Sequence, residues 1–387
     1  MTAAEFLADH AQRLVEVRRD LHAHPELGRD EHRTTQLVGD ALTHVGLSPQ
    51  VLPDGTGLVC DIGPTSPTIA LRADLDALPI PDTKDVSYRS TVDGVAHACG
   101  HDVHTTVVLG TGLALARLHS RDALPHGVRL VFQPAEEVIP GGALDVIEAG
   151  GLAGIHRMFA LHCDPSVDVG TIGLRTGPIT AASDRLEIEV SGPGGHTARP
   201  HLSVDLVGAM GALITQLPAL LNRRTDPRDG TTLVWGQVNS GTAANVIPRS
   251  GVLRGTVRTL SRDAWGALPP LVEELTKSIT SSYGVGYEIS HVRGTPPVIN
   301  DGGSVSAFET AVTDHVSSGT VRDTAQSLGG EDFGWYLDQV PGALARLGVR
   351  TPGSKVTMDL HQSSFDVDER CIAVGVSLLT GVALASA

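Results

Sequence analysis

The chain has 387 residues, 41% of them hydrophobic, and a formal net charge of −15 at pH 7. This length and composition indicate a globular protein of two domains, or of one large domain with an insertion. The acidic balance argues against nucleic acids and anionic membrane surfaces as partners, because both are bound by basic patches. Apolar runs also stay shorter than the about 18 residues that a membrane-spanning helix needs.

The N-terminal segment 1–20 is predicted to form an amphipathic helix that carries both acids and bases. It lacks the uninterrupted apolar stretch of a signal peptide. The four cysteines, at positions 60, 99, 163 and 371, are too few and too scattered for a disulfide framework. We therefore expect a reducing, cytoplasmic setting.

Residues 1 to about 180 alternate short apolar runs with helical patterns, which is typical of an α/β domain with a mixed, largely parallel sheet. Polar residues follow the predicted strands, at the edge where open α/β sheets place their sites. The third strand is expected to end at Pro165, just after His162. The predicted elements are the strands 68–71, 128–132 and 158–165 and the helices 102–120, 141–151 and 368–385.

A different pattern begins near residue 182, where polar and apolar residues alternate as in antiparallel strands with one exposed face. The α/β pattern returns after residue 293. We therefore predict a catalytic domain formed by 1–181 and 294–387, and an inserted α+β domain at 182–293 with a four-stranded antiparallel sheet and two helices. Three strands, at 184–195, 231–241 and 250–260, and two helices, at 204–223 and 262–283, can be located in the insertion.

The segment HACGHDVHTT, residues 97–106, is the first candidate for chemistry. In a loop, with Gly100 giving the backbone freedom, Cys99 and His101 can point at one centre. A thiolate and an imidazole suit zinc or another borderline transition metal. The alternatives are a buried structural cysteine, or a cysteine nucleophile with a histidine base. The nucleophile would leave the glutamates at 136 and 137 without a role.

Glu136 and Glu137 directly follow an apolar strand. Adjacent side chains at a strand end point in different directions, so one carboxylate can bind a metal while the other acts on water. Paired glutamates are by themselves more often a solvated surface. His162 follows the next predicted strand, and His361 precedes the last helix, so four sites with metal-ligand chemistry converge on one α/β scaffold.

Other polar residues near these positions are candidates for supporting roles. A ligating histidine usually needs its other ring nitrogen fixed, and His104, Asp74 or Asp102 could do this. Asp102 could instead cap the following helix. His22 is interpreted as a packing residue at a helix end.

Motifs along nearly the whole chain make it similar to one family. The sequence resembles the metal-dependent aminoacylase/carboxypeptidase superfamily, and within it the branch of hippurate hydrolases, auxin–amino-acid conjugate hydrolases and bacterial N-acyl-amino-acid amidohydrolases. The motifs specify this family far more strongly than any substrate. In chain order they are RRDLHAHPELG, ALRADLDALPI, HACGHDVHTT, LVFQPAEE, ALHCDP, SGPGGHTARPH, VNSGTAANVIP, GTVRTL, GGEDFGWY and LHQSSFDVDE.

The resemblance implies a centre of two divalent metal ions, with zinc expected and manganese or cobalt as alternatives. It implies Glu136 as the general base. One departure is visible, because VIPGGA follows QPAEE where the family has a run of glycines, and this change would reshape the pocket wall. The implied metal ligands are Cys99, His101, Glu137, His162 and His361.

The inserted domain is implied to act as a lid and in dimerisation. His196, in GGHTARPH, matches a histidine that relatives donate across a dimer, so a homodimer and an oxyanion-stabilising role are expected. Asn245 resembles a family residue that contacts the substrate. Arg258 could pair with a substrate carboxylate through its planar fork, or could be a solvated arginine on a strand face.

The function implied is hydrolysis of the amide bond of N-acyl-amino acids to a carboxylic acid and a free amino acid. The alternatives are a metallo-exopeptidase on short peptides, a noncatalytic binding protein on the same scaffold, and a thiol hydrolase using Cys99. The expected partner is a small-molecule substrate, with no nucleic acid and no membrane. The acyl group, the amino acid and the native metal stay open.

Overall fold

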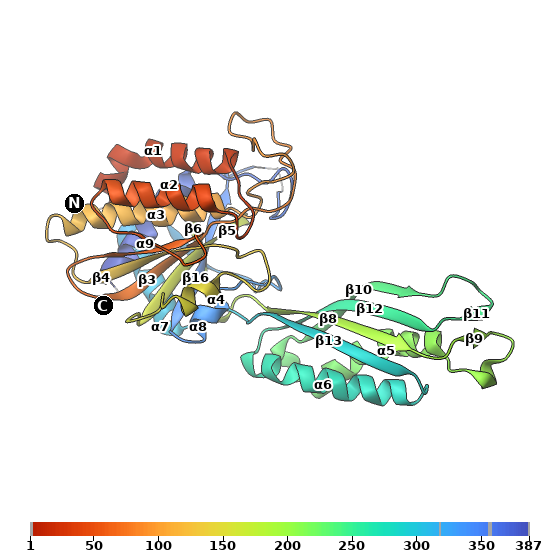
Figure 1. The fold of residues 1–387 in the computed structure, drawn as a ribbon. Helices are drawn as coiled ribbons and strands as arrows, with labels where there is room; N and C mark the ends of the chain where they lie inside the picture. Colours follow the sequence, from red (N-terminus) through yellow and green to blue (C-terminus); the bar gives the residue numbers. More distant parts are fainter. Residues whose placement is uncertain (1–2, 317–318, 355–357, 386–387) are drawn as a thin grey trace. The chain divides into compact units, whose positions relative to one another are not determined.

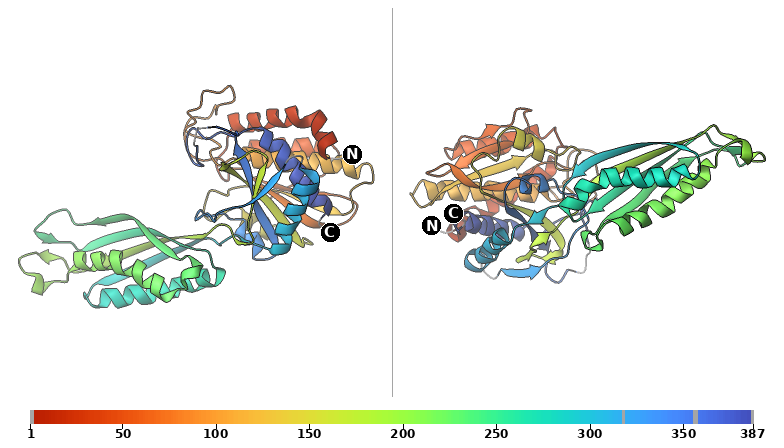
Figure 2. Two further views of the ribbon diagram at one scale, coloured as in Figure 1. Left: turned by 180° about the vertical axis from the view of Figure 1, so that it is seen from behind. Right: turned by 90° about the horizontal axis from the view of Figure 1, so that it is seen from below.

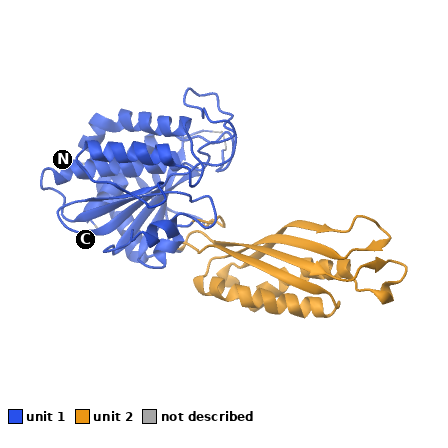
Figure 3. Cartoon of the chain, viewed as in Figure 1, with its two compact units in different colours: residues 1–177, 299–325, 332–387 blue, residues 178–298, 326–331 orange. Residues whose placement is uncertain are grey.

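The computed structural model describes residues 3–316, 319–354 and 358–385, which form two compact units (Figure 3). Unit 2 contains the whole insertion predicted at 182–293, and it also takes in the short segment Gln326–Glu331. That the units are separate domains stays a prediction. Unit 1 comprises Met1–Gly177, Ile299–Ala325 and Asp332–Ala387, and unit 2 comprises Pro178–Val298 and Gln326–Glu331.

An eight-stranded sheet forms the centre of unit 1 (Figure 1). In order across the sheet its strands are β1 (Gln50–Val51), β2 (Leu58–Ile62), β4 (Gly127–Gln133), β3 (Pro67–Asp74), β5 (Arg157–Asp168), β16 (Gly342–Arg350), β6 (Thr171–Leu174) and β15 (Thr320–Asp323). The central strands β4, β3, β5 and β16 run parallel, whereas β1, β2 and β6 join by antiparallel pairing. The predicted mixed, largely parallel sheet is confirmed.

The central strands are apolar because helices or loops cover both of their faces. Two strands are longer than the sequence predicts, since β3 continues past residue 71 to Asp74 and β5 continues past Pro165 to Asp168. Proline cannot donate to a strand ladder, and the pairing of β5 with β16 shifts register between Gly348 and Arg350, where the irregularity is absorbed. The predicted stop at Pro165 was therefore wrong, and His162 lies inside the strand.

Helices of unit 1 pack closely over the sheet. In chain order they are α1 (Ala3–Ala23), α2 (His32–His44), α3 (His101–His119), α4 (Ala143–Glu148), α7 (Gly302–His315), α8 (Gly334–Leu337) and α9 (Arg370–Ala385). Helix α9 contacts both α3 and α7, and α1 packs on α3 and α9 (Figure 2). A Cβ on Gly110 of α3 would lie 2.9 Å from both Leu14 and Val376, so glycine permits this approach.

A buried charge network joins α1, α3 and the segment before α9. The Arg18 side chain is 0% exposed, and its Nε donates to Asp102 Oδ2 at 2.7 Å. Its terminal nitrogens donate to Asp366 at 3.1 Å and to Glu369 at 3.4 Å. His22 Nδ1 also lies 2.7 Å from Asp102 Oδ2, so the buried His22 packs at the end of α1, as predicted, and also joins this network.

Asp102 has a role that the sequence analysis did not assign. The N-cap of α3 is Gly100, and Asp102 lies in the first helical turn, wholly buried. Burial by itself raises the pKa of Asp102, but Arg18 and the hydrogen bond with His22 hold that pKa well below its usual range. Asp102 is thus the anionic centre of a structural network.

We predict that Arg18→Met destabilises unit 1 by about 3–5 kcal/mol, because it leaves Asp102 buried without its cation. The midpoint of urea unfolding measures this change. Arg13→Met is the matched control, since the Arg13 side chain on the same helix is 75% exposed and only pairs with Glu16 at the surface. An equal shift of the midpoint in both variants would contradict the assignment.

Unit 2 contains the predicted four-stranded antiparallel sheet, which is confirmed. In order across the sheet its strands are β10 (Thr232–Ser240), β12 (Ser250–Thr259), β8 (Ala182–Ser191) and β13 (Gly286–Thr295). The sequence analysis did not locate β13. Two helices, α5 (Leu206–Arg224) and α6 (Arg262–Ser281), pack beside each other on this sheet (Figure 2).

The remaining strands are short. They are β7 (Gly177–Pro178), β9 (Gly195–His196), β11 (Val246–Ile247) and β14 (Ile299–Asn300). Within the described ranges, no helix combines the length and the apolarity that a membrane crossing needs.

Candidate metal centre

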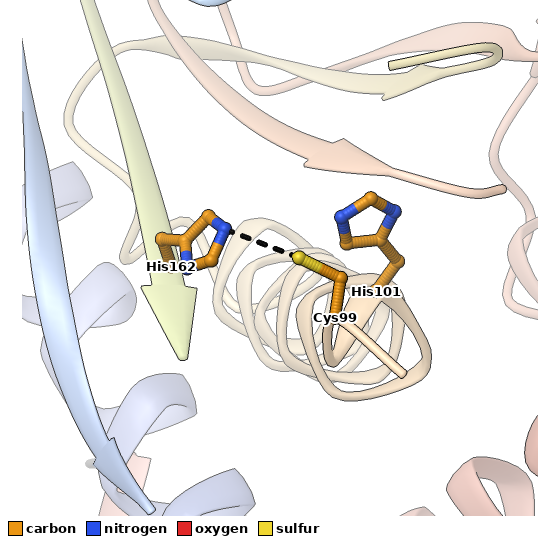
Figure 4. A group of neighbouring side chains, drawn as sticks. All are labelled: Cys99, His101 and His162. Atoms are coloured by element: carbon orange, nitrogen blue, oxygen red, sulfur yellow. Dashed lines mark hydrogen bonds between the residues drawn. The ribbon is translucent and has the colours of Figure 1, made fainter. Parts of the chain in front are cut away.

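The start of α3 brings Cys99 and His101 to one point. Gly100 between them has φ 90°, in the left-handed region that favours glycine. A Cβ at this position would also lie 2.7 Å from the sulfur of Cys163, so no larger residue fits. Figure 4 shows Cys99 and His101 beside His162 of β5, with Cys99 Sγ 3.6 Å from His162 Nε2. The predicted convergence of these three side chains is found in the structure.

The two remaining predicted ligands meet at the same place. Glu137 follows β4, and its Oε1 lies 3.1 Å from His361 Nε2. Potential ligand atoms of Cys99, Glu137 and His361 lie within 4.8 Å of one another, as do those of Cys99, His101 and His162. The structure therefore gathers all five predicted ligands in two overlapping groups that share Cys99.

Glu136, the predicted base, lies at the edge of this cluster. Its carboxylate belongs to a third group with His101 and Glu137, again within 4.8 Å, and its Oε2 is 3.9 Å from His101 Nε2. The Glu136 side chain is 9% exposed, whereas that of His361 is 50% exposed. One side of the cluster is thus open to solvent.

The histidine rings are oriented as metal ligands require. His101 Nδ1 lies 2.9 Å from the Asp76 carbonyl oxygen and 3.2 Å from Asp76 Oδ1, while no described residue hydrogen-bonds His101 Nε2, although that atom is buried. His162 Nδ1 donates to the Cys163 carbonyl oxygen at 2.9 Å, which leaves Nε2 as the acceptor facing Cys99. Such fixed tautomers and a buried ring nitrogen without a hydrogen bond to a described residue fit a metal ion.

The electrostatics of the cluster also favour a bound cation. Burial by itself lowers the pKa of His101, but Asp74, Asp76 and Glu137 raise it to about 10. Burial, followed by the charges of Glu137, raises the pKa of the Cys99 thiol well above its usual range. Buried carboxylates in excess need cations as partners.

One supporting residue differs from its predicted role, and another was not predicted. His104 Nδ1 lies 2.7 Å from Asp74 Oδ1, and its Nε2 accepts from the Cys163 backbone N–H at 2.8 Å. His104 therefore fixes the backbone beside His162, not a ligand ring. The residue that the sequence analysis missed is Asp76, which holds His101. The only sequence feature that could have indicated Asp76 is its position in the acidic loop after β3.

The predicted residues of the insertion lie in unit 2. His196 in β9 is exposed and pairs with Val246 of β11, next to Asn245. The Asn245 carbonyl oxygen accepts from the Thr197 backbone N–H at 3.2 Å, so His196 and Asn245 share one exposed loop pair. Arg258 lies on a different strand, β12, and its guanidinium donates to the Leu328 carbonyl oxygen.

A mixed α/β scaffold with a buried thiol, imidazole and carboxylate cluster defines a candidate metallohydrolase. The chain matches the model of peptidase family M20/M25/M40 over residues 70–385, and it belongs to this family. The resemblance seen in the motifs is thereby confirmed, and the chain is a hydrolase of that family.

Individual relatives cover the chain almost completely. A Rhodococcus jostii protein named "Putative glutamate--cysteine ligase 2-3" is 49% identical over 99% of this chain, but the chain spans only 48% of that relative's length. An N-acetyl-L-cysteine deacetylase of Bacillus subtilis is 38% identical, over 93% of this chain and 85% of the relative.

A solved structure is also similar to this chain over almost its whole length. The Bacillus subtilis YXEP protein, described as a dinuclear metal binding peptidase from the M20 family, superposes with a TM-score of 0.85. The two sequences are 34% identical, and the match covers 97% of this chain and 98% of the other. The likeness therefore extends over both units.

Proposed function

We propose that the chain hydrolyses the amide bond of N-acyl-amino acids and releases a carboxylic acid and a free amino acid. The observation that carries this proposal is the gathering of five ligand-type side chains beside Glu136. Membership of family M20/M25/M40 and the similarity to an N-acetyl-L-cysteine deacetylase support it. The peptidase description of the similar solved structure favours short peptides as the second candidate substrates.

Five side chains are proposed to hold two divalent metal ions. A thiolate, three imidazoles and a carboxylate suit zinc best among the common ions, with manganese or cobalt as alternatives. When bound, such ions polarise an amide carbonyl and lower the pKa of water. The buried Nε2 of His101, which no described residue hydrogen-bonds, supports the assignment. The ligands are Cys99, His101, Glu137, His162 and His361.

Glu136 is proposed to move the proton of the reaction. Its carboxylate lies within 4.8 Å of ligand-type atoms of His101 and Glu137, and it is not among the five proposed ligands. Glu136 would take a proton from the attacking water and deliver it to the departing amine nitrogen. The reaction is then balanced, because the water supplies the hydroxyl group of the carboxylic acid and the hydrogen that the departing amine gains.

The insertion is proposed to complete the site as a lid and dimerisation domain. His196 would donate a hydrogen bond to the oxyanion from the second copy of a homodimer, and its exposure in β9 is compatible with that role. Asn245 and Arg258 would contact the substrate. A cytoplasmic location belongs to the same proposal.

A substrate panel tests the function. We expect turnover of N-acetyl- and N-benzoyl-amino acids by the purified protein, its loss on treatment with a chelator, and recovery with zinc, manganese or cobalt. Higher turnover of dipeptides would favour the exopeptidase alternative. Hydrolysis that chelators do not inhibit but thiol alkylation does would support a thiol mechanism. The absence of hydrolysis after metal reconstitution would support a binding protein.

Glu136→Gln is expected to lower kcat by roughly 10²–10⁴-fold while the metal content stays unchanged, because the amide cannot accept the proton. Steady-state kinetics and elemental analysis measure the two quantities. Glu148→Gln, at an exposed glutamate of α4, is the control and should leave both unchanged. Near-normal turnover in Glu136→Gln would remove Glu136 as the base.

Cys99→Ser is expected to lower the metal content, because a neutral hydroxyl replaces a thiolate ligand. Elemental analysis of protein purified without added metal gives the readout. Cys60→Ser is the control, since Cys60 is equally buried but lies in β2, away from the ligand groups. An unchanged metal load in Cys99→Ser would exclude Cys99 as a ligand.

A further inference from the structure

The turn that carries Glu136 has an unusual backbone. Ala135, the residue before Glu136, has φ 55° and is 0% exposed. A Cβ makes this left-handed conformation unfavourable, and a non-glycine residue keeps it only when the surroundings impose it. The conformation of Ala135 also sets the direction in which the chain enters Glu136. The groups that hold Ala135 are therefore relevant to the base.

One of these groups is the Glu31 carboxylate, which reaches the turn from another part of the chain. Glu31 Oε1 accepts a hydrogen bond from the Ala135 backbone N–H at 2.6 Å, across 104 residues of sequence. The Glu31 side chain is wholly buried, and none of the described residues hydrogen-bonds its Oε2. Burial raises the pKa of Glu31 to about 7. A buried carboxylate that makes this one long-range bond is unfavourable for stability alone.

Helix capping does not explain Glu31. It occupies the N-cap position of α2, yet its side chain makes no capping bond there. Glu26 caps α2 instead, because its two carboxylate oxygens accept hydrogen bonds from the backbone N–H groups of Arg33 and Thr34, both at 2.8 Å. The two glutamates of the segment HPELGRDE thus accept hydrogen bonds from different parts of the backbone. Glu26 accepts from residues of α2, and Glu31 accepts from Ala135.

Neighbouring contacts fix the same turn from other sides. The Ala135 carbonyl oxygen accepts from the Gly142 backbone N–H at 2.9 Å, and Asp76 Oδ2 accepts from the Glu137 backbone N–H at 2.9 Å. A Cβ on Gly28 would lie 3.2 Å from Ala135 Cα, so the segment before α2 packs directly on the turn. Glu31 supplies the bond to the residue with the strained φ.

We propose that Glu31 is a positioning residue for the general base, because its carboxylate holds Ala135 in the left-handed conformation that directs Glu136. This inference rests on the proposed role of Glu136. Glu31 touches neither substrate nor metal ligands in this role. It acts through the backbone of one residue, and its effect should fall on turnover more than on substrate binding.

Four variants test the proposal in the full-length, metal-loaded protein. Glu31→Leu should lower kcat about 10–100-fold, with KM and metal content within about twofold of the parent. Glu31→Gln should recover most of kcat, because its amide oxygen can still accept from the Ala135 N–H. Adding Ala135→Gly to Glu31→Leu should restore kcat at least severalfold, since glycine adopts a positive φ without the Cβ penalty. Glu26→Leu, which uncaps α2, should lower Tm and leave kcat unchanged.

Other results would overturn the proposal. An unchanged kcat in Glu31→Leu would do so, as would a loss that neither Glu31→Gln nor Ala135→Gly repairs. A loss of kcat that follows a loss of metal content, or that Glu26→Leu reproduces together with its lower Tm, would show a structural role only. If Glu136→Gln is inactive while Glu31→Leu is fully active, the inference about Glu31 is wrong and the proposed role of Glu136 as the base still holds. An active Glu136→Gln would instead refute the proposed base.

Discussion

Asp76 connects both sides of the candidate metal centre, and the arrangement of the cluster depends on it. Its carbonyl oxygen and Oδ1 contact the Nδ1 of His101, and its Oδ2 accepts from the backbone N–H of Glu137. One buried residue thereby fixes the ring of His101 on α3 and the backbone of Glu137 after β4. Because hydrogen bonds in a buried site are directional and costly to leave unmade, these two candidate ligands cannot move apart independently.

Two buried arginines balance the carboxylates around this centre. Arg72 in β3 forms ion pairs with Asp74 at 2.7 Å and with Asp332 at 2.8 Å. Arg18 in α1 forms a buried ion pair with Asp102 in the same way. Each arginine joins acids that are distant in sequence, so the packing of unit 1 and the charge state of the site are coupled. Removing one partner from such a network leaves an uncompensated buried charge.

Left-handed backbone conformations occur at the candidate metal centre. Gly100 lies between Cys99 and His101, Ala135 precedes Glu136, and His361 itself has φ 63°. The backbone N–H of His361 also donates to the Ala98 carbonyl oxygen at 2.8 Å, which ties its loop to the start of α3. Sparsely populated conformations at functional positions are held by surrounding contacts, and here those contacts come from several elements.

The sequence by itself determined the local structure and the kinds of ligand. Apolar runs predicted the cores of β3 and β4, helical periodicity predicted α3 and α9, and the motifs identified Cys99 and Glu137 as ligand-type residues. These signals are local, since they depend on strand and helix periods and on short spacings. The distant His361 was a candidate from its place before the last helix, and the family resemblance, which covers nearly the whole chain, implied it as a ligand.

Only the tertiary structure decided which buried groups meet. Asp102 pairs with Arg18 across 84 residues, and Glu31 reaches Ala135 across 104. No local pattern encodes such pairings, because they depend on which helices and strand ends the fold brings together. The continuation of β5 past Pro165 has the same origin, since its pairing with β16 overrides the local breaker.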